Sequence, residues 1–142
     1  MIDKYEVTHF GGAPIVLNML ANAPKDQQKE LKRKVYVLTA GAPPPSIIFE
    51  KMKKLGFEVM HVYGLTETYG HILQCAWNDE WDGLDQDNQN EIKARQGVRY
   101  PNTEGVVVMD PETMKPIPHD GKTMGEIMVR GNVVMKGYFK DK

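Results

Sequence analysis

Residues 35–68 read VYVLTAGAPPPSIIFEKMKKLGFEVMHVYGLTET, and this stretch decides the fold. It begins with a short apolar run at 35–38 that is rich in residues favoured in strands, which is typical of a strand buried on both faces. Apolar residues at helical spacing follow over 46–55, and Gly56 supplies a helix stop signal. A second apolar run at 57–63 predicts another strand. Strand, helix and strand in this order predict a parallel sheet with flanking helices.

The residues upstream of this stretch extend the same pattern. Residues 5–10 predict a short strand, which Gly11 and Gly12 end. Pro14 stands where proline is favoured, at the first position of a helix. We therefore predict the α/β class for residues 1–98, with a parallel sheet and flanking helices.

The rest of the chain, residues 99–142, has a different character. An acidic, amide-rich surface segment at 77–90 precedes it, with a helix predicted near 91–95. Strands are predicted at 104–109 and 125–131, and their turn-rich connection indicates an antiparallel hairpin. We expect residues 99–142 to begin a small antiparallel β subdomain. Because a lone hairpin is marginal in water, we also expect the chain to be a piece of a larger domain.

Composition excludes several classes of function. The 18 basic and 19 acidic residues give a formal charge of −1, which offers no electrostatic reason for a nucleic-acid partner. Cys75 is the only cysteine, so an internal disulfide is excluded. No apolar run approaches the ~18 residues of a transmembrane helix, and the first residues lack the layout of a signal peptide. We expect a cytoplasmic protein without a transmembrane segment.

The segment HVYGLTET at 61–68 carries the residues suited to chemistry. Tyr63 offers a flat face on which a purine can stack, and Gly64 allows backbone to approach a ligand closely. Thr66 can donate to a phosphate oxygen, and Glu67 can bind a hard cation such as Mg²⁺. On chemistry alone, an ordinary turn with an exposed Thr-Glu pair explains these residues equally well.

Three segments in order resemble the motifs of the adenylate-forming (AMP-binding) superfamily. Residues 63–67 resemble its Tyr-Gly-x-Thr-Glu motif, and residues 39–43 resemble the Gly/Ala-rich loop that precedes this motif. The segment 125–131 with Gly137 and Tyr138 resembles the later Gly-Glu…Arg-Gly…Gly-Tyr segment. The resemblance implies that both parts of the chain belong to one truncated AMP-binding domain.

Further matches indicate the branch of the superfamily. Thr68-Tyr-Gly70 and the segment 93–97 are most similar to fatty-acyl and short-chain acyl-CoA synthetases, a branch that includes plant acyl-activating enzymes. Peptide-synthetase adenylation domains commonly have proline in place of Leu65. The resemblance implies an ATP-dependent carboxylic acid:CoA ligase that forms acyl-AMP and then acyl-CoA. It implies a carboxylic acid, ATP and CoA as small-molecule partners, and Mg²⁺ as the cation.

The resemblance also implies a role for individual residues. Tyr63 would stack on one face of the adenine, and His61 would lie near the adenine amino group. Thr66 would hold the α-phosphate and Glu67 the magnesium, which makes these two the implied catalytic residues. The other face of the adenine would meet Gly41, Ala42 and Pro43. The acyl group would be bordered by Ala40, Gly64, Leu65 and Gly70.

Other parts that the family uses are not found in the sequence. Its Ser/Thr/Gly-rich phosphate loop is expected upstream of residue 39, and no such segment precedes that residue. The ribose-binding aspartate, the hinge and the C-terminal domain with its lysine are expected beyond residue 142. We therefore expect the isolated chain to lack turnover and to self-associate through apolar faces that other segments would cover.

Two other interpretations stay open. The chain can be a nucleotide-binding or interaction module that kept the pocket loop without the chemistry, or an α/β structural domain whose motifs are coincidental. Among the remaining candidates, lone histidines such as His9 and His71 are more often structural than catalytic. Cys75 lacks a local histidine partner and is expected to be inert. The acid that the enzyme would activate stays open.

Overall fold

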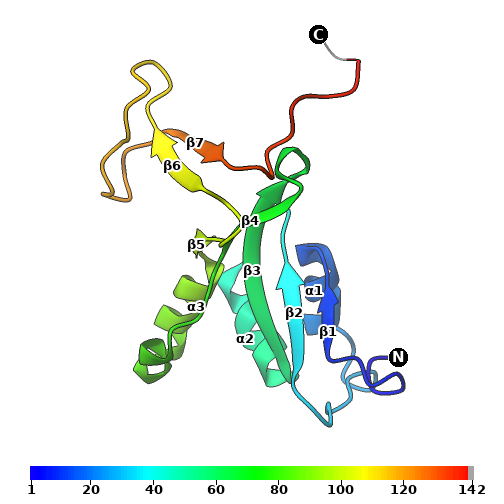
Figure 1. The fold of residues 1–142 in the computed structure, drawn as a ribbon. Helices are drawn as coiled ribbons and strands as arrows, with labels where there is room; N and C mark the ends of the chain where they lie inside the picture. The colour runs from blue at the N-terminus through cyan, green and yellow to red at the C-terminus, as the bar shows by residue number, and fades with distance from the viewer. Residues whose placement is uncertain (141–142) are drawn as a thin grey trace. The chain divides into compact units, whose positions relative to one another are not determined.

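The computed structural model describes residues 1–140, which form two compact units (Figure 1). Unit 1 comprises Met1–Tyr63 and Leu73–Val98, and unit 2 comprises Gly64–Ile72 and the residues from Arg99 onward. Within residues 1–140, no helix has both the length and the apolar character that a membrane span requires.

Unit 1 contains the parallel sheet that the sequence predicts. Strands β1 (His9–Gly11), β2 (Val35–Thr39) and β3 (Phe57–Leu65) are parallel neighbours, and the sheet continues to β4 and β5 in the order β1-β2-β3-β4-β5. Two helices make the crossover connections, α1 (Pro14–Ala21) between β1 and β2, and α2 (Ser46–Lys54) between β2 and β3. The predicted α/β class is confirmed.

Helices α1 and α2 cover one face of β1–β3, and Figure 1 shows both behind the strands. Leu17 of α1 and Met52 of α2 are fully buried against Val35 and Val37 of β2. The alternation of side chains along a strand sends the intervening residues to the opposite face. There Leu38 is 44% exposed and Met60 is 37% exposed. Parallel sheets are normally covered on both faces, so unit 1 presents an apolar sheet face that α1 and α2 do not cover.

The boundaries of several elements differ from the prediction. Strand β1 occupies residues 9–11 rather than 5–10, because residues 2–6 form turns in which Tyr5 N–H donates to the Met1 carbonyl. Helix α3 (Gln86–Ala94) begins well before residue 91, because the Asp85 carboxylate accepts a hydrogen bond from Asn88 N–H at 2.9 Å. A carboxylate at the N-cap satisfies one of the free N–H groups of the first turn.

Strand β4 (Gly70–Gln74) was not predicted. It follows β3 after a connection of only four residues, and such a short connection permits an antiparallel return but not a parallel one. Cys75 N–H donates to the His61 carbonyl at 2.9 Å, next to the end of this strand. Three further short elements are the 3-10 turns η1 (Thr66–Thr68) and η2 (Asp79–Gly83) and the strand β5 (Val98–Arg99).

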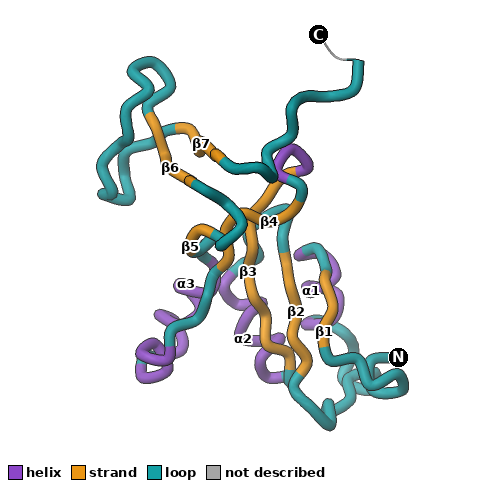
Figure 2. Tube along the Cα trace, viewed as in Figure 1, coloured by secondary structure: helices purple, strands orange, loops and turns teal. Residues whose placement is uncertain are grey.

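Unit 2 contains the predicted hairpin. Strands β6 (Gly105–Met109) and β7 (Glu126–Arg130) pair antiparallel, with Val107 opposite Met128. Figure 2 shows the long loop connection between them in teal. Asp120 stabilises this connection, because its carboxylate accepts hydrogen bonds from the Lys122 and Thr123 N–H groups at 2.8 Å. The same hydrogen bonds, with that from Thr123 the stronger influence, lower the pKa of Asp120 to about 2.

Candidate active site

In unit 1, strands β2 and β3 bring two of the predicted segments to the same edge of the sheet. Thr39, the last residue of β2, lies opposite His61 of β3. The loop that follows β2 therefore leaves the sheet beside the carboxyl-terminal part of β3, the edge where ligands bind to parallel sheets. Ala40 is half-buried, and the three predicted adenine-loop residues are exposed: Gly41, Ala42 and Pro43.

His61 is a buried residue that joins β3 to α3. Its Nδ1 lies 2.9 Å from the carbonyl oxygen of Ala94, the last residue of α3. Because a carbonyl can only accept, Nδ1 carries the proton, and in the neutral ring Nε2 is then an acceptor. An acceptor at this position suits an amino group, the role implied for His61. Tyr63, two residues further along β3, is half-buried.

In unit 2, the turn after β3 is closed by Thr68, a residue to which the sequence analysis gave no role. The hydroxyl of buried Thr68 accepts a hydrogen bond from Leu65 N–H at 2.9 Å. It also lies 3.0 Å from the Leu65 carbonyl and 2.9 Å from the Gly70 carbonyl, either of which can accept its single proton. This closure leaves Thr66 exposed and Glu67 half-buried on the outside of the turn. The only sequence signal was the match of Thr68-Tyr-Gly70 to the family.

The structure gives a physical reason for glycine at position 64 that the sequence analysis did not contain. A Cβ at this position would lie 2.0 Å from the Gly70 carbonyl oxygen and 2.5 Å from His71 Cα. The missing side chain therefore allows the backbone of β4 to approach closely, and the place of Gly64 beside the acyl group stays a prediction. Leu65 and Gly70, the neighbouring residues predicted at the acyl group, are exposed on the two sides of the same turn.

The Glu67 side chain and backbone are both held by the C-terminal segment of unit 2. The Tyr138 hydroxyl donates to Glu67 Oε1, and Met135 N–H donates to the Glu67 carbonyl at 2.8 Å. The hydrogen bond from Tyr138 is the main reason that the pKa of Glu67 lies below its usual value. The same contact raises the pKa of Tyr138. A glutamate is ordinarily a carboxylate at neutral pH, and this contact favours the same form.

A single carboxylate of this kind fits one type of metal site. Within residues 1–140, no group of three His, Cys, Asp or Glu side chains forms a ready-made cage. Mg²⁺ does not need one, because it is commonly bound by one or two carboxylates together with water and substrate phosphates. Glu67 therefore suits a magnesium ion that arrives with a nucleotide, rather than an ion held by the protein alone.

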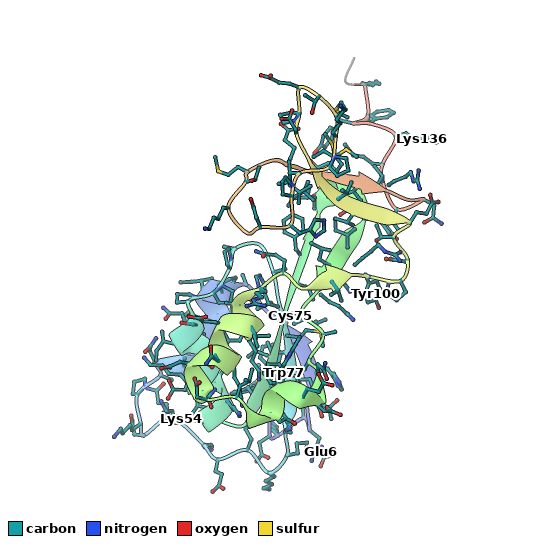
Figure 3. All side chains as sticks on the ribbon, turned by 90° about the vertical axis from the view of Figure 1, so that its left-hand side faces the viewer. Glu6, Lys54, Cys75, Trp77, Tyr100 and Lys136 are labelled. Carbon is teal, nitrogen blue, oxygen red and sulfur yellow. The ribbon has the colours of Figure 1, made fainter. Side chains whose placement is uncertain are left out.

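Unit 1 also contains a hollow that is lined mainly by residues without a predicted role in the site. Its volume is about 830 Å³, and its lining includes Tyr36, Leu38 and Met60 of the exposed sheet face. Trp77, labelled in Figure 3, forms part of its wall. His61 is the only predicted site residue in that lining. Because ligands of parallel sheets bind at the carboxyl edge, we place the candidate site at the edge and not in this hollow.

The chain matches the family described as AMP-binding enzyme over residues 1–139. It belongs to this family. Among curated members, it is 56% identical to a peroxisomal acetate/butyrate–CoA ligase of Arabidopsis thaliana over 143 residues, and 56% identical to an acetate–CoA ligase of Humulus lupulus. It is 45% identical to a peroxisomal trans-cinnamate:CoA ligase of Petunia hybrida. Each comparison covers 99% of this chain but 25% of the relative, so the chain spans about a quarter of their length.

Solved structures of a CoA synthetase and a CoA ligase share the fold. The chain is similar to the O-succinylbenzoate–CoA synthetase of Bacillus subtilis in complex with ATP and magnesium, with a TM-score of 0.73 and 24% identity over 99% of this chain and 26% of that one. It is also similar to an anthranilate–CoA ligase in complex with anthranoyl-AMP, with a TM-score of 0.76 and 16% identity over 99% of this chain and 24% of that one. At these identities the comparison shows the fold.

Proposed function

We propose that the chain contributes the nucleotide and acyl edge of an ATP-dependent carboxylic acid:CoA ligase. The observation that carries the proposal is the ordered turn after β3, in which Thr68 closes the backbone and Glu67 is presented as a carboxylate. Membership of the AMP-binding family and the CoA-ligase names of the relatives support the same reaction.

The reaction has two steps. In the first, the carboxylate oxygen of the acid attacks the α-phosphorus of ATP, the bond to the β-phosphate oxygen breaks, and acyl-AMP and pyrophosphate form. In the second, the CoA thiolate attacks the acyl carbonyl and AMP leaves. Charge develops on the α-phosphate oxygens during the first step, so donors and a cation aimed there lower the barrier. A bound Mg²⁺ would neutralise part of that charge.

Each predicted residue has a proposed task in the first step. The Thr66 hydroxyl, which is exposed, donates to an α-phosphate oxygen, and the Glu67 carboxylate binds the magnesium. Tyr63 stacks on the adenine, and His61 Nε2 accepts from the adenine amino group. The opposite face of the adenine meets the loop of Gly41, Ala42 and Pro43. The acyl group lies beside Ala40, Gly64, Leu65 and Gly70.

We propose small carboxylic acids as the substrate class. The two relatives at 56% identity are named for acetate and for acetate or butyrate, and a relative at 45% is named for trans-cinnamate. We also propose that residues 1–98 and 99–142 both belong to one AMP-binding domain. The cytoplasmic location stays a prediction, and two of these relatives are named as peroxisomal.

A chimera tests the proposed function. Residues 1–142 would replace the matching quarter of the Arabidopsis acetate/butyrate–CoA ligase, and ATP–pyrophosphate exchange would be measured with acetate and with butyrate. We expect acid-dependent exchange, because 56% identity preserves the sheet and the turn that position the reacting groups. Exchange without added acid provides the background. A folded chimera that binds ATP without exchange would instead support a module without the chemistry.

We also propose that the isolated 142-residue chain self-associates. Exposed Leu38 and Met60 lie on the sheet face that α1 and α2 leave open, and exposed apolar patches promote association. Sedimentation velocity should show larger species as concentration rises, and the double substitution of Leu38→Lys with Met60→Lys should reduce them. Leu84→Lys, at an exposed position outside the sheet, is the matched control. A monomer at all concentrations, with cooperative unfolding, would contradict the prediction.

A further inference from the structure

The Gly137-Tyr138 pair ends the motif that begins at residue 125, and the proposed chemistry gives it no task. Within unit 2, however, the segment 135–138 makes two separate hydrogen bonds to Glu67. Met135 N–H binds the Glu67 carbonyl at 2.8 Å, and the Tyr138 hydroxyl binds Glu67 Oε1. Figure 3 labels Lys136 within this segment. Residues 68 positions or more apart in the sequence therefore meet at one residue, Glu67.

The two contacts act on different parts of Glu67. The backbone contact fixes where the residue lies, because it holds the main chain of the 3-10 turn η1. The hydroxyl contact fixes the direction of the carboxylate, because it occupies Oε1, while no other side chain or N–H group within residues 1–140 donates to Oε2. A glutamate has three rotatable side-chain bonds, so an unrestrained carboxylate on an exposed turn would sample many directions. A hydroxyl that restrains one oxygen lowers the entropic cost of binding a cation with the other.

We infer that Tyr138 is a positioning residue that directs the Glu67 carboxylate toward the magnesium of the bound nucleotide. The inference rests on the proposed function. Met135 assists by holding the backbone of the turn. In this interpretation, the Gly137-Tyr138 motif places a hydroxyl beside the metal-binding carboxylate.

The test uses the chimera described above with Tyr138→Phe, which removes the hydroxyl and keeps the ring. Partners that orient a metal ligand typically contribute 10–100-fold to metal affinity. Because Tyr138 is about half exposed, we expect the low end of that range, an increase of about tenfold in the Mg²⁺ concentration that gives half-maximal exchange. The rate at saturating Mg²⁺ should change by less than about twofold, since the carboxylate itself is retained. Tyr100→Phe, in the same unit, is the matched control.

A second readout does not depend on turnover. Electron paramagnetic resonance of Mn²⁺ reports the fraction of Mn·ATP bound to the chimera, and Tyr138→Phe should weaken that binding about tenfold. A third measurement combines the substitution with Glu67→Gln. If Tyr138 acts through the carboxylate, its removal should change the Mg²⁺ dependence by less than about twofold once the carboxylate is absent.

Unchanged Mg²⁺ and Mn²⁺ dependence in Tyr138→Phe, in a chimera that exchanges normally, would overturn the inference and leave the proposed function intact. An equal tenfold effect in the Glu67→Gln background would overturn it as well, because the effect would then come from folding rather than from the carboxylate. A folded parent chimera that neither exchanges nor binds Mn·ATP would overturn the proposed function and this inference with it. Thermal unfolding of each variant separates lost stability from lost binding.

Discussion

Glu67→Gln in the chimera is expected to lower ATP–pyrophosphate exchange by about 10²–10³-fold. Glutamine keeps the size of the side chain and can still accept the Tyr138 hydrogen bond, but it removes the negative charge. The magnesium would then lose its protein carboxylate, and the charge that develops on the α-phosphate would be less stabilised. The folded structure should be unaffected, because Glu67 lies at the surface of the turn that Thr68 closes.

Two other substitutions make this prediction specific. Thr66→Val removes the proposed α-phosphate donor at nearly constant shape, and we expect a loss of the same order. Glu112→Gln removes a carboxylate from an exposed position elsewhere in unit 2 and should leave exchange unchanged. Exchange near the parent level in Glu67→Gln would remove the magnesium role from this residue. A loss of thermal stability that matches the loss of exchange would indicate a structural role instead.

Gly97→Ala is expected to destabilise unit 1 by about 3 kcal/mol or more. Gly97 has a φ of +86°, and a Cβ there would lie 1.9 Å from the Gln74 carbonyl oxygen and 2.4 Å from Cys75 Cα. Both neighbours are backbone atoms, so a rotamer change cannot relieve the clash. Either the segment after α3 must move away from the end of β4, or the strand must shift. Urea unfolding followed by circular dichroism measures the change.

Gly83→Ala is the matched control in the same unit. A Cβ at Gly83 would meet no atom within 4 Å, and its φ lies in the ordinary range. We expect a change within about 0.5 kcal/mol, as for most surface substitutions. Similar unfolding midpoints for the two alanine variants would show that the contact between Gly97 and Gln74 is not required.

The sheet could be predicted from the sequence because the pattern that indicates each strand is local. The apolar runs that became β2 and β3 are buried against α1 and α2, and each run is continuous in the sequence. Gly56 ends the intervening helix as predicted, with a φ of +90° that suits glycine. The motif of residues 63–67 likewise stands at the end of its strand, because a turn signal directly follows the apolar run. The roles of its residues in binding stay predictions.

Contacts between residues far apart in the sequence were decided only by the tertiary structure. Strand β4 has few of the usual strand residues at its start, and its formation depends on the close backbone approach that Gly64 permits. The hydrogen bond from His61 Nδ1 to the Ala94 carbonyl requires α3 to end beside β3. The contact of Tyr138 with Glu67 joins two motifs that the sequence shows only as separate matches. Local periodicity and turn chemistry thus determined the elements of this protein, whereas hydrogen bonds between distant residues, which leave no periodic pattern, determined how the candidate site is held.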